Sequence, residues 1–170
     1  MLATLLLLAA CSPQTEYTHA IPKNASVVLG MEMDEMAKKA HDTSIAIHHR
    51  LMEEGKPGVP ACRLYEIAME MTKEAGLEDY FMGHKQKAGY IGHGVGIEIN
   101  EAPVIAPRSR ETLVVGNVIA LEPKYVIPHV GAVGVESTYV VTENGLECIT
   151  NYPYCIQTNE GNISKPHLIF

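Results

Sequence analysis

Three short motifs place a side chain that could bind a metal ion inside an apolar or glycine-rich run. His93 lies in GHGVG, Glu122 in ALEP and Glu136 in GVES. A carboxylate within an apolar strand is costly to bury unless it pairs with a cation. One imidazole and two carboxylates form a nitrogen and oxygen ligand set, which suits Mn, Co, Zn or Fe better than a metal that prefers thiolates. The motifs therefore predict a divalent metal site.

Each of these residues, taken alone, also has a plainer interpretation. Glu122 or Glu136 could be an exposed residue on a half-buried strand, and His93 could be a core histidine whose nitrogens are hydrogen-bonded. The glycines beside His93 favour a site, because they let backbone and substrate approach closely.

Two helices are expected upstream of these motifs. The first follows Gly30, with Asp34 as N-cap, and ends at Gly55. The second begins at Pro60 and has Gly76 as its C-cap. The residues expected on their inner faces are Met36, Ala40, Ile47 and Leu51 in the first helix, and Leu64, Ile67, Ala68 and Met71 in the second.

From Tyr90 onward, short Val and Ile runs separated by Gly, Asn and Pro predict strands. The expected strands cover residues 89–95, 118–122, 133–142 and 147–151, and residues 143–145 form a hairpin turn between the last two. Two helices followed by an antiparallel sheet indicate an α+β fold. The polar tail after Gln157 is expected to be loosely held.

The whole-chain composition limits the classes of partner. The chain has 170 residues, 46% of them hydrophobic, a formal net charge of −7 and no Trp. This length suits one domain, and the negative charge argues against nucleic acid as a partner.

The cysteines and the N-terminus allow more than one interpretation. The four cysteines have no zinc-site spacing and are expected to be free thiols, although Cys148 and Cys155 are close enough in sequence to pair. The segment LLLLAACS before and around Cys11 is similar to the end of a lipoprotein signal, yet no basic residue precedes it. A buried strand or a sequence outside the true reading frame would explain the same segment, so we expect a cytoplasmic protein, with membrane attachment only if Cys11 is lipidated.

The three motifs, read together in order, resemble the creatinase, Xaa-Pro aminopeptidase and methionine aminopeptidase family of metallopeptidases (peptidase family M24). The resemblance covers about residues 31–152 and rests on GHGVGIEINEAP, NVIALEPKYVIP and GAVGVESTYVVTENGLECIT. It implies a pita-bread fold with helices on a curved, mostly antiparallel sheet. It further implies two divalent ions (Mn, Co or Zn), bound by two Asp, one His and two Glu.

The resemblance gives the motif residues their roles. His93, Glu122 and Glu136 match the His and the two Glu ligands, and Glu136 matches the ligand that bridges both ions. Glu122, the ligand also credited with proton transfer, and His93 are the expected catalytic residues. Asn100 stands where many relatives carry a substrate-contacting His, and His84 is expected to line the substrate pocket. The histidines of the first predicted helix, His48 among them, are assigned no function.

The match fails upstream, where the two Asp ligands are expected. Glu16 aligns with the second Asp, and the first falls near Leu5, which cannot bind a metal. We therefore expect a fragment that largely lacks the N-terminal half-unit. Residues 1–30 would be a remnant or signal-like segment, 31–156 the later part of the catalytic domain and 157–170 a tail.

The expected function is that of an Xaa-Pro aminopeptidase, which hydrolyses peptide bonds near a substrate N-terminus through a metal-bound hydroxide. As an alternative to two ions, this chain binds a single ion or none. The alternative function is a non-catalytic pita-bread module that binds peptides or proteins. A homodimer is expected, because relatives dimerise and open strand edges invite pairing.

Overall fold

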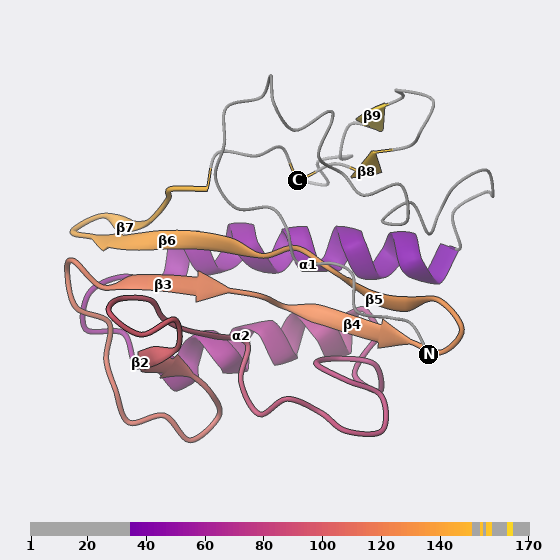
Figure 1. The fold of residues 1–170 in the computed structure, drawn as a ribbon, viewed down its shortest axis with the longest axis horizontal. Coiled ribbons are helices and arrows are strands. Elements are labelled where there is room, and N and C mark those ends of the chain that lie inside the picture. The colour runs from indigo at the N-terminus through magenta and orange to yellow at the C-terminus, as the bar shows by residue number, and fades with distance from the viewer. Residues whose placement is uncertain (1–34, 151–153, 155, 158–162, 165–170) are drawn as a thin grey trace.

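Two helices pack on one face of an antiparallel sheet in the computed structural model, which describes residues 35–150, 154, 156–157 and 163–164. Figure 1 shows α1 and α2 behind the strands. The elements in chain order are α1 (Glu35–Glu54), α2 (Ala61–Glu74), β1 (Gly92–Gly94), β2 (Glu101–Ile105), β3 (Val118–Leu121), β4 (Lys124–Ile127), β5 (Gly131–Gly134), β6 (Ser137–Thr142), β7 (Gly145–Cys148), β8 (Ile156–Gln157) and β9 (Ile163–Ser164). The α+β prediction is confirmed.

The strands form a five-stranded sheet in the order β2-β1-β3-β6-β7 and a separate β4-β5 pair. All of these pairings are antiparallel. β3 leads directly into β4, and β5 leads directly into β6, so two long strands run side by side through both units (Figure 1). β8 and β9 pair with each other near the C-terminus.

The inner faces of the helices meet the sheet in one core. Buried members include Leu51, Leu64, Ile119 and Tyr139. The first helix was predicted to bury Met36, but this side chain is 37% exposed, so that prediction was wrong. The buried face of α1 follows helical spacing and includes polar residues as well as apolar ones. It contains Ala37, Ala40, Ser44, His48 and Leu51.

The strand predictions need three corrections. The segment predicted as one strand over residues 133–142 is two strands, β5 and β6, with a break at Val135 and Glu136. β2 and β4 were not predicted. The last hairpin turns at Glu143 and Asn144, because Thr142 pairs with Gly145 and β7 begins there. The predicted N-cap Asp34 and the predicted segment 1–30 lie outside the described residues.

The end of α2 is closed by a left-handed glycine. Gly76 has φ +63°, and its N–H donates to Lys73 O at 2.8 Å while Leu77 N–H donates to Thr72 O at 3.0 Å. This is a Schellman termination, which an L side chain at the same φ makes less favourable.

We expect Gly76→Ala to lower the free energy of unfolding by about 1 kcal/mol, because alanine is strained at positive φ. A Cβ there would contact no other atom within 4 Å, so backbone strain is the sole cause of the loss. Urea denaturation measures the change. Gly76→Asn, which tolerates this conformation better, should lose less, and equal losses in the two variants would contradict the explanation.

Candidate metal centre

Glu122 and Glu136 face each other where both long strands pass from one sheet to the other. Leu121 pairs with Ser137, and Lys124 pairs with Gly134. Continuing that register places Glu122 opposite Glu136. Side chains of directly opposed residues lie on the same face of a sheet, so the two carboxylates point to the same side.

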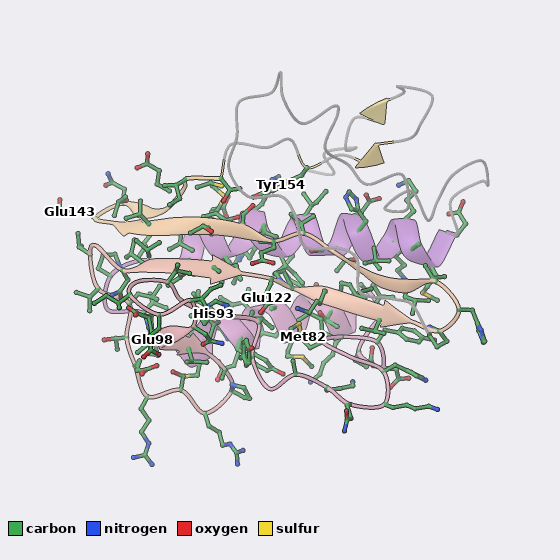
Figure 2. The ribbon with its side chains drawn as sticks, viewed as in Figure 1. Met82, His93, Glu98, Glu122, Glu143 and Tyr154 are labelled. Carbon is green, nitrogen blue, oxygen red and sulfur yellow. The ribbon has the colours of Figure 1, made fainter. Side chains whose placement is uncertain are left out.

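His93 lies on the neighbouring strand and on the same face. It pairs with Ala120, which is two residues before Glu122 and so shares its face. Figure 2 shows His93 and Glu122 near the middle of the sheet. The Nδ1 atom of His93 lies 3.0 Å from Gly94 O. Because a carbonyl oxygen only accepts, a neutral His93 ring carries its proton on Nδ1 and keeps the Nε2 lone pair for a ligand.

The electrostatics at Glu136 are those of a partly buried carboxylate beside a second negative charge. Burial, followed by the negative charge of Glu122, raises the pKa of Glu136, whereas Lys124 and His93 act in the opposite direction. Glu136 Oε2 is buried and finds no hydrogen-bond partner among the described residues. Glu122 is itself buried, and its Oε2 accepts a hydrogen bond from Lys124 Nζ.

These donors fit a divalent ion in type, and the unpartnered Glu136 oxygen is a free acceptor for one. Within residues 35–150 and the few described residues after them, no group of three or more His, Cys, Asp or Glu side chains could hold a metal ion as arranged. The described part of the chain thus supplies a carboxylate pair with an imidazole on the next strand. The positions considered for the two Asp ligands, Leu5 and Glu16, lie outside the described residues.

Side chains of helix α1 hydrogen-bond to the backbone directly beside Glu122 and Glu136. Ser44 Oγ donates to Pro123 O at 2.7 Å and accepts from Val135 N–H at 3.0 Å. His48 Nε2 lies 2.8 Å from Val135 O. Pro123 has no N–H to give to Val135 O, and its own carbonyl accepts from Ser44 Oγ, so both polar groups of Val135 are satisfied by helix side chains instead. This explains why the sheet breaks beside Glu122 and Glu136.

A buried polar chain continues from His48 toward the C-terminal segment. His48 Nδ1 lies 2.7 Å from Tyr139 Oη, and Tyr154 Oη lies 2.9 Å from Tyr139 Oη and 2.8 Å from Ser137 Oγ. Burial lowers the pKa of His48 to about 4, a shift that the hydrogen bond to Val135 O opposes and the nearby His49 reinforces. A neutral His48 donates from Nε2 to the carbonyl and accepts at Nδ1 from Tyr139.

The two predicted substrate residues lie in different places. Asn100 is exposed in the loop between β1 and β2, with Nδ2 3.4 Å from Tyr90 Oη, and the Tyr90 ring meets the His93 ring edge-on at 6.1 Å between centroids. Tyr90 thus links Asn100 to His93. His84 is exposed and stacks on Tyr80, with 6.3 Å between centroids.

Sequence reasoning missed Ser44, His48, Tyr90 and Lys124 as parts of this region. The sequence could have placed Lys124 beside Glu122, because the two are two residues apart and a strand places such residues on one face. Ser44 and His48 are four residues apart on a helix, but nothing in the sequence shows which backbone groups they meet.

Two further findings concern the cysteines and the length and hydropathy of the helices. Cys62 and Cys148 are free thiols, as expected, and Cys11 and Cys155 lie outside the described residues. Among the helices that the structure describes, none is long and apolar enough to cross a membrane.

Comparison with known families places the chain in a known class of proteins. Residues 6–143 match the family described as metallopeptidase family M24. The chain belongs to this family, so the resemblance found in the sequence is confirmed.

Individual relatives agree with this assignment. The chain is 38% identical over 125 residues to the Xaa-Pro dipeptidase of Pyrococcus furiosus, an alignment that covers 74% of this chain and 34% of the relative. Among solved structures, it superposes on the prolidase from Pyrococcus furiosus with a TM-score of 0.64 at 36% identity, covering 71% of this chain and 34% of that one. The X-Pro aminopeptidase from Thermotoga maritima gives a TM-score of 0.67 at 27% identity, covering 75% and 34%. The chain spans about a third of the length of these relatives and matches about a third of their pita-bread fold.

Proposed function

We propose that this chain contributes the His93, Glu122 and Glu136 ligands to the metal centre of an Xaa-Pro peptidase, which hydrolyses peptide bonds near a substrate N-terminus. The observation that carries the proposal is the opposed pair Glu122 and Glu136, with a buried carboxylate oxygen that lacks a partner. The names of the relatives, Xaa-Pro dipeptidase, prolidase and X-Pro aminopeptidase, support the reaction class.

Each residue has a task in this proposal. Two divalent ions, when bound, would supply Lewis acidity and an activated water. Glu136 would offer its unpartnered Oε2 to the ions, and His93 would offer Nε2. Glu122 would hold one carboxylate oxygen for binding and accept a proton with the other. Asn100 would donate a hydrogen bond from Nδ2 to the peptide, and His84 is a second proposed substrate contact.

Titration of the purified chain with Mn²⁺, Co²⁺ or Zn²⁺ by isothermal calorimetry tests the ligand assignment. We expect Glu136→Gln to weaken binding by at least about tenfold, because an amide lacks the charge that attracts the ion. Glu147→Gln, at an exposed position of β7, is the matched control and should bind as the wild type does. Equal affinities for the wild type and Glu136→Gln would exclude Glu136 as a ligand.

Hydrolysis of Xaa-Pro dipeptides, measured with and without added metal, tests the reaction. Turnover that stops on chelation and in Glu122→Gln supports the proposal. Metal binding without turnover would indicate the second candidate, a non-catalytic pita-bread module that binds peptides or proteins. One observation favours that candidate, namely that the Lys124 ammonium already occupies Glu122 Oε2.

A further inference from the structure

We propose that Lys124 is the resident counter-ion of the Glu122 and Glu136 pair, and that a divalent ion must displace its ammonium from Glu122 in order to bind. The second part rests on the proposed function, whereas the first concerns the metal-free protein alone.

The ion pair forms because Lys124 and Glu122 lie two residues apart along one extended run. Lys124 Nζ donates to Glu122 Oε2, and the side chains are 28% and 11% exposed, respectively. Among the described residues, Lys124 is the one lysine whose side chain is not exposed. Withdrawing a charge from water in this way is costly without a paired opposite charge. The lysine therefore belongs to the carboxylate pair and not to the general surface charge.

The neighbouring backbone leaves room for Lys124 and fixes its position. The residue opposite it is Gly134, where a Cβ would lie 2.7 Å from Lys124 Cβ and 2.6 Å from Pro123 O. A side chain at position 134 would therefore push against the lysine. On the other edge of β4, Met82 N–H donates to Lys124 O at 2.8 Å. β4 is therefore bound on both of its edges at Lys124, by β5 on one side and by Met82 on the other.

The carboxylate pair needs a positive charge. Like charges directly opposed on neighbouring strands destabilise a sheet, and Glu122 and Glu136 are opposed. The ammonium of Lys124 also acts on Glu136, where it lowers the pKa that burial and Glu122 raise. A divalent ion bound to both carboxylates would take over this neutralising role, and the lysine would then be repelled by it.

A double-mutant cycle on the full chain in EDTA tests the counter-ion. We expect Lys124→Met to lower the melting temperature by about 4 °C in the wild-type background and by about 1 °C or less in Glu122→Gln. Lys124→Arg, which keeps the charge, should restore most of the loss. Lys56→Met removes an exposed lysine and should change nothing. Equal losses in the two backgrounds would refute the counter-ion.

Titration with Mn²⁺ tests the displacement. Removing the ammonium leaves two uncompensated carboxylates, so Lys124→Met should bind Mn²⁺ about tenfold more tightly than the wild type. Lys124→Arg and Lys56→Met should bind as the wild type does.

The possible results separate the two proposals. Equal Mn²⁺ affinity in the wild type and Lys124→Met, or an equal gain in Lys56→Met, would overturn the displacement. If Mn²⁺ binds neither the wild type nor Lys124→Met, the displacement falls together with the proposed metal centre. Coupling between Lys124 and Glu122 in EDTA would in that case still support the counter-ion.

Discussion

A His48→Ala variant should lose about 3 kcal/mol of the free energy of unfolding at neutral pH. The His48 side chain is fully buried, and its two nitrogens satisfy Val135 O and Tyr139 Oη. Alanine would leave Val135 O without its partner and Tyr139 Oη with Tyr154 alone, and it would open a cavity. The lost hydrogen bonds and the cavity each contribute roughly 1–3 kcal/mol. Urea denaturation followed by circular dichroism measures the loss. The exposed neighbour gives the control, because His49→Ala should change stability by about 0.5 kcal/mol or less.

His48 should also make the stability depend on pH. Its pKa in the folded protein is about 4, below the 6.5 of an unperturbed histidine, so the unfolded state binds more protons between these values. Stability contributed by the neutral ring is therefore complete above pH 6.5 and is lost as the pH falls toward 4, by a total of about 3 kcal/mol.

His48→Gln separates the titration of the ring from its hydrogen bonds. Glutamine can donate to Val135 O but does not titrate, so this variant should lose less stability than His48→Ala at neutral pH. The difference in unfolding free energy between the wild type and His48→Gln should shrink as the pH falls from 6.5 to 4. A difference that stays constant over that range would show that His48 is not the responsible group.

Gly94→Ala is the second change with a large expected effect. A Cβ at this position would lie 2.2 Å from Ala102 O and 2.6 Å from Ala102 C, so backbone would have to move. We expect a loss of about 3 kcal/mol, at the upper end of typical overpacking costs. Because β1 pairs with β3 as well as β2, the movement should displace His93 and weaken metal binding together with stability.

Gly89→Ala is the matched control for Gly94→Ala. A Cβ at Gly89 would meet nothing within 4 Å, and the residue has no positive φ. This variant should remain within about 0.5 kcal/mol of the wild type. A Gly94→Ala protein as stable as Gly89→Ala would mean that β1 and β2 do not approach as closely as described.

The helices could be predicted from the sequence because their signals are local. Apolar residues recur at helical spacing, and Gly55 and Gly76 mark the ends of the first and second helix. Both predicted ends agree with the structure. The strands β2 and β4 were missed for a local reason as well. Pro103 lies inside β2, and β4 is enclosed by Pro123 and Pro128, so both segments have the composition of loops.

The break between β5 and β6 has no local signal at all. Residues 133–142 have the composition of one continuous strand, and the break exists because Ser44 and His48 take the polar groups of Val135. Those contacts join positions about ninety residues apart in sequence. The same limit applies to the candidate site. Its three proposed ligands stand out by type, whereas Tyr90 and the helix residues acquire a role only through packing that pairs distant segments.

The shared register of the two long strands determines where the chain can accept insertions. A residue added in the turn between β4 and β5, around Pro128 and His129, would leave Glu122 opposite Glu136 if the turn absorbed it. A residue added inside β3 would turn every later side chain of that strand to the opposite face and direct Glu122 into the helix-covered core. Length variation is therefore tolerable at the tip of this hairpin and damaging at its base.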